Sequence, residues 1–473
     1  MKILIHGINF SPELTGIGKY SGEMADWLLA RGHEVRVVTA PPYYPQWRVA
    51  DGFANWWRKD QGQGARGKGQ VDTKSLEPCA LNLESVVVYR CPLWVPAKPS
   101  GLKRLLHLAS FALSSFPAML SQIFWRPDVV MVIEPPLMCA PTVLLVAKLS
   151  GARAWLHVQD FEVDAAFDLG ILKSRWLRIL VLTIERWLMS RFDRVSTISP
   201  KMLEKLLDKG VASSKALLFP NWVEINQFQD ARYKVQGKAT SYREELGISA
   251  DAVVALYSGN MGGKQGLEIL AQVAKLQAQG ARYEVQGARY TPARGGPCGS
   301  RSLRYDRYAQ DQGTSTPPPL DPEIIFVFCG DGAGRADLVA RCEGLPNVRF
   351  MDLQPQERLS ELLAFADIHL LPQRADAADL VMPSKLTGML ASGRPVVATA
   401  HANTELANVV TGCGLVVEPE QPQAFADAIN MLARDATLRE RLGKAGRVYA
   451  EKYLDRDVVL AKFEQDLLAC VKQ

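Results

Sequence analysis

The stretch from Leu380 to Ala398 reads Leu-Val-Met-Pro-Ser-Lys-Leu-Thr-Gly-Met-Leu-Ala-Ser-Gly-Arg-Pro-Val-Val-Ala. A proline followed by Ser384 is typical of a helix start. The next residues predict a short apolar helix that ends at Gly393. Residues 396–398 predict a buried strand. Lys385 then lies in the first helical turn, where free backbone N–H groups and the helix dipole favour an anion. This combination suits a diphosphate, and the alternative is an ordinary capped helix with a solvated lysine.

The composition indicates a folded protein of two or three domains. The chain has 473 residues, of which 48% are hydrophobic and 22% are charged, and such proportions form a core. The net charge of +5 is small and dispersed. Because zinc-finger spacing and RNA-binding aromatic signatures are also missing, we expect no nucleic-acid partner.

The cysteines and the first residues indicate a reducing compartment. Eight cysteines are scattered without a C-x-x-C pair, which favours small core residues over a disulfide framework or a zinc site. The apolar run at residues 3–5 is interrupted at once by His6-Gly7. It therefore predicts a strand and not a signal peptide, and we expect a cytoplasmic protein.

Short apolar strands alternate with helices in both halves of the chain. We expect strands at residues 3–8, 35–39, 86–89, 129–133, 154–158, 253–257, 324–328, 348–351, 368–371 and 396–398. Uninterrupted apolar strands separated by helices predict parallel sheets covered on both faces. The expected fold class is α/β, with two Rossmann-like domains, residues 1–220 and 221–454, that face each other across a cleft. An amphipathic helix within residues 455–473 is expected to pack back on the first domain.

Three segments depart from this alternation, and one of them, residues 98–125, is long and apolar. Residues 56–73 are rich in Gly, Gln and basic residues and predict a loop. Residues from about 279 to 322 are low in complexity, and the Gly-Ala-Arg-Tyr of residues 280–283 recurs at residues 287–290. We expect a flexible surface insert there and not a solenoid.

Two glycine-rich loops each follow a strand and precede a helix, one loop in each half. The first contains Gly16 and Gly18, and the second contains Gly259, Asn260 and Lys264. Glycines let a phosphate or a sugar approach the backbone at a helix N-terminus. The first loop lacks the third glycine and the later acidic residue of a dinucleotide fingerprint, which argues against NAD. The alternatives are a glycine turn without a ligand and a solvated lysine.

Polar residues follow two further strands. Asp331 lies in a Gly-Asp-Gly turn, which suits close approach by a nucleobase and is equally a plain turn. His157, Asp160 and Glu162 follow one another at the end of another strand. Asp160 suits a hydroxyl ligand or a base, and His157 is either its partner or a satisfied core histidine. The acidic residues are also compatible with a solvated loop. A metal site made of these carboxylates is not expected, because the sequence offers no further ligands beside them.

Two helical segments are candidates for contact with a membrane. Residues 173–194 interleave Trp, Leu and Ile with Arg, a pattern typical of a helix that lies among lipid headgroups. Residues 98–125 are long and apolar, with basic residues near their start, but Pro117 and several serines argue against a clean span. The alternative for both segments is packing on the sheet.

Taken together, these motifs resemble the GT-B glycosyltransferases of family 4, and more closely those of colanic acid biosynthesis. The similarity includes His6-Gly-Ile-Asn-Phe-Ser-Pro-Glu-Leu-Thr-Gly-Ile-Gly-Lys-Tyr within residues 1–45. It extends over residues 157–170, 197–228, 257–270, 326–338 and 381–398. It covers nearly the whole chain except the insert and part of residues 56–73.

The chain departs from the family pattern at four positions. Family members carry two glutamates, eight positions apart, where this chain has Leu380 and Gly388. They carry Arg and Lys where this chain has Asn260 and Gln265. Because transferases that build polysaccharide repeats share the Pro-Ser-Lys variant, we do not interpret these departures as loss of activity. Asp379, next to one missing glutamate, is expected to replace it.

The resemblance implies a retaining, metal-independent transfer that needs no cofactor. The donor would be a nucleotide-diphosphate sugar, with GDP-fucose favoured, bound by residues 221–454. The acceptor, bound by residues 1–220, would be a polyprenyl-diphosphate-linked saccharide at the inner face of the cytoplasmic membrane. The expected catalytic residues are Asp160, Lys385 and Lys264; the donor-binding residues are Gly16, Gly18, Gly259, Asn260, Asp331, Ser384 and Asp379; the acceptor-binding residues are His157 and Glu162.

Two other functions remain open from the sequence. A sugar-nucleotide 2-epimerase has the same fold and glycine loops, but it needs carboxylates around the sugar, and the replaced glutamates count against it. An inactive scaffold of capsule assembly is the second alternative.

Overall fold

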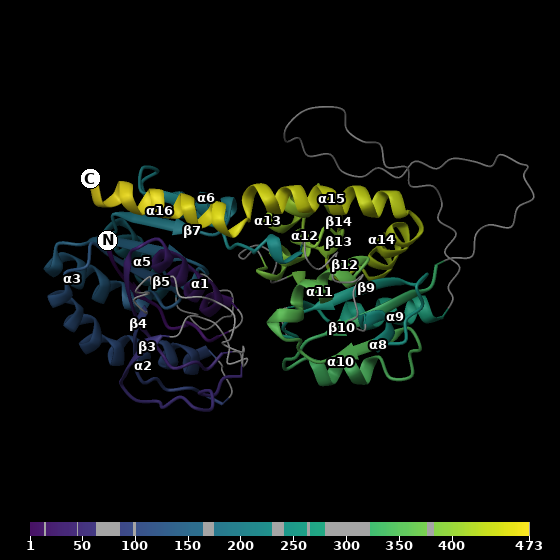
Figure 1. Cartoon of the computed structure of the whole chain (residues 1–473), viewed down its shortest axis with the longest axis horizontal. Coiled ribbons are helices and arrows are strands. Elements are labelled where there is room, and N and C mark those ends of the chain that lie inside the picture. The colour runs from purple at the N-terminus through teal and green to yellow at the C-terminus, as the bar shows by residue number, and fades with distance from the viewer. Residues whose placement is uncertain are drawn as a thin grey trace, which may run out of the picture.

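The chain forms two α/β domains, one on each side in Figure 1. The computed structural model describes residues 1–13, 16–44, 46–62, 86–97, 101–163, 175–228, 241–262, 265–279, 322–375 and 383–472. Lys264, Asp379, Leu380 and the interior of the predicted insert lie outside these residues.

The N-terminal sheet has the strand order β3-β4-β2-β1-β5-β6-β7-β8. The strands are β1 (Lys2–His6), β2 (Glu34–Thr39), β3 (Arg58–Gly62), β4 (Val86–Arg90), β5 (Val129–Glu134), β6 (Arg153–Val158), β7 (Arg194–Thr197) and β8 (Ala216–Leu218). All neighbouring strands are parallel except β3 and β4. The central strands are buried on both faces, which is why they are continuous apolar runs in the sequence.

The prediction of a loop at residues 56–73 is wrong for the edge strand β3. This strand pairs antiparallel with β4 through its backbone, so its side chains need not be apolar. The Asp60 carboxylate lies 2.6 Å from Arg58 Nε and 3.3 Å from Arg90 Nε. Residues 63–73 lie outside the described residues.

Helices cover both faces of the N-terminal sheet. They are α1 (Gly16–Ala30), α2 (Gly101–Ser121), α3 (Ala140–Ser150), α5 (Arg175–Ser190), α6 (Pro200–Asp208) and α16 (Arg456–Lys472), with short 3₁₀ turns η1 (Gln122–Trp125) and η2 (Leu137–Cys139). One core lies under α2, α3, α5 and α6, and the other lies under α1 and α16. The last helix therefore completes the first domain.

The segment Gly101–Trp125 is the only described helix long and apolar enough to cross a membrane. One face of α2 packs in the core through Leu108, Phe111 and Met119. Only 28% of its apolar stretch is buried, so much of the remaining apolar surface faces outward.

The C-terminal sheet is entirely parallel, in the order β11-β10-β9-β12-β13-β14. Its strands are β9 (Val253–Ser258), β10 (Ile324–Cys329), β11 (Val348–Met351), β12 (Ile368–Leu371), β13 (Val396–Thr399) and β14 (Gly414–Val417). Its helices are α8 (Tyr242–Glu245), α9 (Glu268–Ala278), α10 (Arg335–Arg341), α11 (Leu359–Phe365), α12 (Lys385–Ala391), α13 (Glu405–Val410), α14 (Pro422–Arg434) and α15 (Ala436–Tyr453), with a 3₁₀ turn η4 (Gln356–Arg358).

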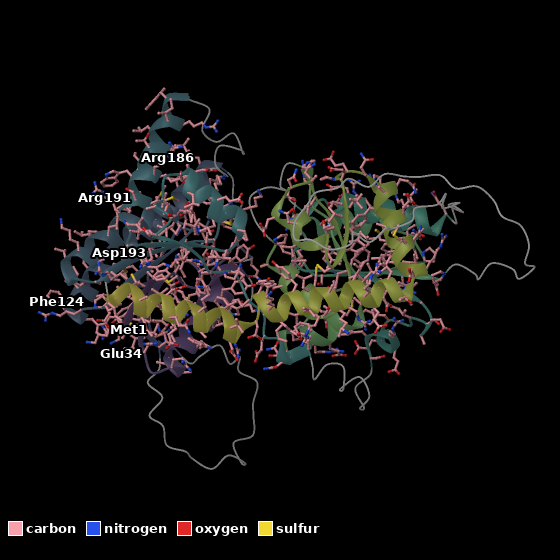
Figure 2. The ribbon with its side chains drawn as sticks, turned by 90° about the horizontal axis from the view of Figure 1, so that it is seen from above. Met1, Glu34, Phe124, Arg186, Arg191 and Asp193 are labelled. Atoms are coloured by element: carbon pink, nitrogen blue, oxygen red, sulfur yellow. The ribbon has the colours of Figure 1, made fainter. Side chains whose placement is uncertain are left out.

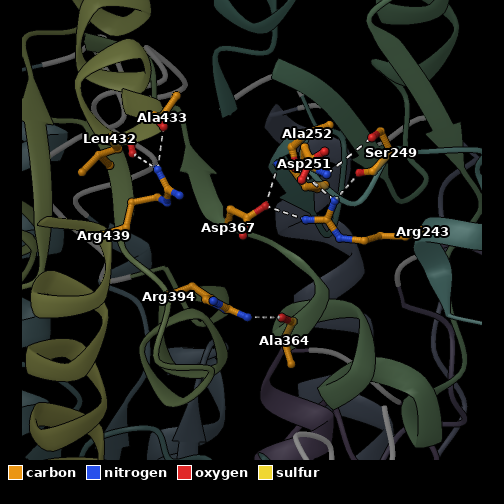
Figure 3. Close-up of polar contacts among 11 residues, drawn as sticks. Arg243, Ser249, Asp251, Ala252, Ala364, Asp367, Arg394, Leu432, Ala433 and Arg439 are labelled. Carbon is orange, nitrogen blue, oxygen red and sulfur yellow. Dashed lines mark hydrogen bonds and ion pairs between the residues drawn. The ribbon is translucent and has the colours of Figure 1, made fainter. Parts of the chain in front are cut away.

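The carboxylate of Asp367 links β9 to α8 near the start of this sheet (Figure 3). Asp367, just before β12, accepts a hydrogen bond from the backbone N–H of Val254 at 2.9 Å and another from Arg243 Nη2 at 2.8 Å. Arg243 also donates to the carbonyls of Ser249 and Ala252. One side chain of α8 thus fixes the loop that leads into β9.

The chain crosses between the domains twice, and the two crossings are hydrogen-bonded to each other. Val223 N–H donates to the Leu454 carbonyl at 2.8 Å, and Arg456 N–H donates to the Val223 carbonyl at 3.1 Å. Helices α15 and α16 follow one another along one side of both domains (Figures 1 and 2). The second crossing therefore lies between these two helices.

Candidate functional site

Helix α12 places Lys385 at the carboxyl end of the C-terminal sheet. Ser384 occupies the predicted N-cap position, but its hydroxyl accepts no hydrogen bond from a backbone N–H of the helix. Ser384 has helical backbone angles, and its carbonyl instead accepts a hydrogen bond from Thr387 Oγ1 at 2.8 Å. The helix begins as a tight turn after the proline, and its first residue is the lysine.

Lys385 rests on the strand that precedes the second glycine loop. Its Nζ donates to the Tyr257 hydroxyl at 3.0 Å and lies 4.3 Å from the centre of the Tyr257 ring. The Tyr257 hydroxyl in turn donates to the Asn260 carbonyl at 2.7 Å. The side chain passes beside Gly259, because a β-carbon at that position would lie 3.6 Å from Lys385 Nζ. Burial lowers the pKa of Lys385 to about 8, and an anion bound beside the ammonium group would raise this pKa again.

The second glycine-rich loop packs against the turn that contains Asp331. Met261 N–H donates to the Asp331 carbonyl at 2.8 Å, and Gly334 N–H donates to the Met261 carbonyl at 2.8 Å. A β-carbon on Gly332 would lie 2.6 Å from Asn260 Oδ1. The contact between the loops therefore requires a glycine at position 332, whether or not a ligand is bound. The Asp331 carboxylate accepts the Gly332 N–H at 2.7 Å and stays exposed.

Two departures from the family pattern have local structural reasons. Gln265, at a family lysine position, closes the glycine loop by accepting the Gly262 N–H at 2.9 Å. At Gly388, a β-carbon would lie 2.9 Å from Leu363 Cδ1 of the adjacent α11. A glutamate at that position would need the Leu363 side chain to move.

The first glycine loop is organised by Glu13, which the sequence reasoning missed. Its Oε1 accepts the N–H groups of Tyr43 and Tyr44 at 3.0 and 3.1 Å, and its Oε2 accepts from Asn9 Nδ2 at 2.9 Å. A β-carbon on Gly18 would lie 2.6 Å from Glu13 Cβ. Gly18 therefore lets the carboxylate enter beneath α1. The available signal was a single glutamate between the strand end and the Gly16 turn.

Tyrosines from the N-terminal domain reach the C-terminal domain. The Tyr44 hydroxyl faces the Asn260 side chain, and the Tyr20 hydroxyl faces the Thr387 side chain. The nearest atom to a β-carbon built on Gly16 is Tyr44 Cε1, at 3.9 Å. Tyr44 thus connects the Gly16 turn to the Gly259–Asn260 loop, and Tyr20 connects α1 to α12.

His157 has protein partners on both ring nitrogens. Its Nδ1 lies 2.9 Å from Ser196 Oγ, and its Nε2 lies 2.9 Å from Gln159 Nε2. Gln159 also hydrogen-bonds to Asn221 at the domain crossing. Burial lowers the pKa of His157 to about 3, so the ring is neutral at neutral pH. Any contact of this histidine with an acceptor would need one of these partners to move.

Asp160 and Glu162 follow β6, and the structure brings them near Glu134, a second residue that sequence reasoning missed. Glu162 Oε2 accepts the Leu137 N–H at 3.1 Å, and Asp160 is half-buried. Within the described ranges, no three His, Cys, Asp or Glu side chains are placed to hold a metal ion, and six described cysteines are free and buried.

Residues 15–222 match the family model of the glycosyl transferase 4-like domain, and residues 316–435 match that of the glycosyl transferases group 1. The chain is 40% identical over 476 residues to the Escherichia coli K12 protein named "Putative colanic acid biosynthesis glycosyl transferase WcaI", a match that covers 99% of this chain and 100% of the relative. It is also 30% identical over 212 residues to the D-inositol 3-phosphate glycosyltransferase of Nocardioides sp., across 44% of this chain and 40% of that protein.

Solved structures share the fold at low sequence identity. Sucrose-phosphate synthase from Thermosynechococcus elongatus has a TM-score of 0.64 at 16% identity and covers 98% of this chain and 97% of its own. Anabaena Alr3699/HepE, solved in complex with UDP, has a TM-score of 0.61 at 14% identity and covers 99% of this chain and 100% of its own. With both domain models matched and the full-length similarity to a colanic acid transferase, the chain belongs to the GT-B glycosyltransferases that join a 4-like domain to a group 1 domain.

Proposed function

We propose that this glycosyltransferase moves a sugar from a nucleotide-diphosphate sugar to a lipid-linked saccharide, with retention at the anomeric carbon and without a metal ion. GDP-fucose is the favoured donor, and exopolysaccharide synthesis of the colanic acid type is the favoured process. The full-length similarity to the Escherichia coli relative supports the process. The donor, the acceptor and the stereochemistry are our inference from the family resemblance.

The observation that carries the proposal is the position of Lys385. Its ammonium group lies between the Tyr257 ring and Gly259, beside a loop that touches Tyr44 of the other domain. A diphosphate beside this loop would meet a cation of lowered pKa that gains its proton fully when the anion binds. Stabilisation of charge on a leaving diphosphate by a fixed cation is a large catalytic contribution. We assign two sets of residues. The donor would be bound by Lys385, Lys264, Gly259, Asn260, Asp331, Ser384 and Asp379, with Gly16 and Gly18 opposite. The acceptor would be bound by Asp160, His157 and Glu162.

The surface of the N-terminal domain supports a lipid-linked acceptor. Helix α2 exposes Leu102 and Leu113, which are 68% and 77% accessible, and η1 exposes Phe124. Helix α5 exposes Trp176 and Trp187. In Figure 2, Arg186 and Arg191 lie at the outer edge of this domain, away from the C-terminal domain. Apolar and basic side chains on one surface are typical of peripheral binding to anionic lipid.

A donor screen tests the proposal. Purified protein is incubated with GDP-fucose, other GDP-sugars and UDP-sugars, together with a polyprenyl-diphosphate-linked glucose, and products are identified by mass spectrometry. We expect one donor to yield an elongated lipid-linked saccharide, with the α or β configuration of the donor preserved in the NMR spectrum. Addition of EDTA should leave the rate unchanged.

Other outcomes of the same screen contradict the proposal. Formation of an epimer from UDP-N-acetylglucosamine without acceptor would identify an isomerase. Absence of both donor binding and product, with a well-folded protein, would favour the scaffold function. Inversion of the anomeric configuration would leave a glycosyltransferase but exclude the retaining mechanism.

A further inference from the structure

The last residue of β5 is a buried glutamate. Glu134 is fully buried, and neither carboxyl oxygen has a hydrogen-bond partner among the residues that the structure describes. Its carbonyl accepts the Gln159 N–H at 3.0 Å, so the residue lies at the carboxyl end of the sheet, directly beside β6. An ionised carboxylate in such a place is strongly disfavoured unless a proton or a cation neutralises it.

Three other carboxyl groups face Glu134. Glu162 and Asp160 come from the segment after β6, and Glu185 comes from α5. Glu185 is paired with Lys209, which follows α6, at 2.6 Å between Oε2 and Nζ. Lys209 also faces Glu134, but its charge is already matched by Glu185. The group therefore holds more carboxylates than the cation of this pair can neutralise.

The surroundings of Glu162 differ from those of Glu134. Glu162 accepts the Leu137 N–H, and Arg104 of α2 faces it, while its Oε1 is shielded from solvent without a partner among the described residues. Burial raises the pKa of Glu162, and the amide and Arg104 oppose this rise. The buried Cys139 thiol faces Glu162 as well, and its pKa is raised well above the usual range by burial.

A proton neutralises this group better than a metal ion. Burial first, and then the charges of Glu162, Glu185 and Asp160, raise the pKa of Glu134 well above its usual range, and Lys209 offsets only part of this. Among the described residues, no three carboxylates converge as metal ligands would. Carboxyl groups this close titrate as a unit, and the first proton goes to the group with the fewest hydrogen-bond donors. That group is Glu134.

We propose that Glu134 is a positioning residue that holds one proton on the acceptor side of the N-terminal domain, so that Asp160 and Glu162 remain ionised and ready to accept hydrogen bonds from the hydroxyls of a saccharide. The acceptor part of this inference rests on the proposed function, whereas the proton on Glu134 does not. If Glu134 lost its proton, a further negative charge would appear beneath Glu162 and Asp160. Both carboxylates would then be displaced, and the acceptor would bind less well.

Thermal stability tests the proton without any substrate. Glu134→Gln keeps the size of the side chain and imitates the protonated acid. Because the pKa of Glu134 in the folded protein lies well above the ordinary value of 4.5, the wild type has to take up a proton on folding at any pH above that value. We therefore expect the melting temperature of the variant to exceed that of the wild type least near pH 4.5 and progressively more as the pH rises towards 9.5. Glu464→Gln is the matched control, because Glu464 is buried, pairs with His33 at 2.8 Å and with Arg31, and has a lowered pKa. That variant should melt below the wild type over the whole range.

The dependence of transfer on pH tests the positioning role. At saturating donor, so that a bound diphosphate keeps Lys385 charged, kcat/KM for the acceptor should fall at alkaline pH in the wild type and stay flat in Glu134→Gln. Glu162→Gln should raise the acceptor KM at every pH. An unchanged alkaline fall and unchanged acceptor KM in Glu134→Gln would overturn the positioning role and leave a purely structural acid.

The two measurements separate the possible failures. If Glu134→Gln melts well below the wild type at pH 6, as Glu464→Gln does, Glu134 is ionised and paired, and the inference is overturned. If the wild type transfers no sugar from any donor, the proposed function fails, while the melting curves still decide whether Glu134 holds a proton.

Discussion

Lys385 is half-buried, and Gly259 lets its side chain lie against the backbone. Lys385→Met should lower kcat/KM for the donor by about 10²- to 10³-fold, the usual loss when one fixed charge-stabilising group is removed. Lys444→Met, on the exposed surface of α15, is the control. A loss of less than about threefold in kcat/KM would contradict the assigned role, because removal of one charge-stabilising group normally costs far more.

The lowered pKa of Lys385 also predicts a pH dependence. The ammonium form is needed, and its pKa is about 8 because of burial. Activity should therefore decline as pH rises through about 8 in kcat/KM for the donor, which reports the free enzyme. Lys385→Arg should keep its charge, so its residual activity should not decline over the same range. If kcat/KM of the wild type for the donor stayed constant up to pH 9.5, the ammonium form of Lys385 would not be needed for activity.

Gly18 tests the packing of Glu13 beneath α1. Alanine inside a helix normally stabilises relative to glycine by up to about 1 kcal/mol. At position 18, however, the new β-carbon would lie 2.6 Å from Glu13 Cβ, and overpacking of this kind costs about 1–3 kcal/mol. Gly18→Ala should thus lower the free energy of unfolding measured in urea. Gly412→Ala, which meets no atom within 4 Å, should have little effect.

At the scale of elements, α2 and α5 carry the proposed membrane contact. Each has one face in the core and leaves apolar side chains on the other. Leu113→Glu should weaken co-sedimentation with phosphatidylglycerol vesicles at low salt without changing the melting temperature, because Leu113 is 77% exposed. Val448→Glu on α15, also an exposed apolar position, is the control. Equal binding of both variants and the wild type would exclude α2 from the lipid contact.

At the scale of the whole molecule, α16 makes the C-terminus part of the first domain. Phe463 is 2% exposed and stacks on Phe219 at 4.1 Å between ring centres, next to Trp155. Phe463→Ala should lower the stability of the N-terminal domain by about 3–5 kcal/mol, as large-to-small changes in a core do. Calorimetry should show an earlier transition for that domain, with the other unchanged. A shift of both transitions together would indicate one cooperative unit.

The order of helices and strands was largely predictable, and most of the exceptions lie at the edge of a sheet. Strands β11 and β12 have the predicted bounds, since each is a short apolar run between turn residues. The strands that were not predicted, β3, β7, β8 and β14, are short or polar and lie towards the edges of the sheets. At an edge, backbone pairing decides the structure more than side-chain burial does.

The sequence by itself determined the two parallel sheets, the glycine loops at their ends and the lysine at the start of α12, because these depend on hydrophobic periodicity and on residues close together in the chain. Only the tertiary structure decided that Glu13 fastens one glycine loop and that Tyr44 meets Asn260. It also decided that Glu134 is buried among other carboxyl groups. Such contacts join residues far apart in sequence, and the burial that gives a charge its state is a property of the whole packed domain.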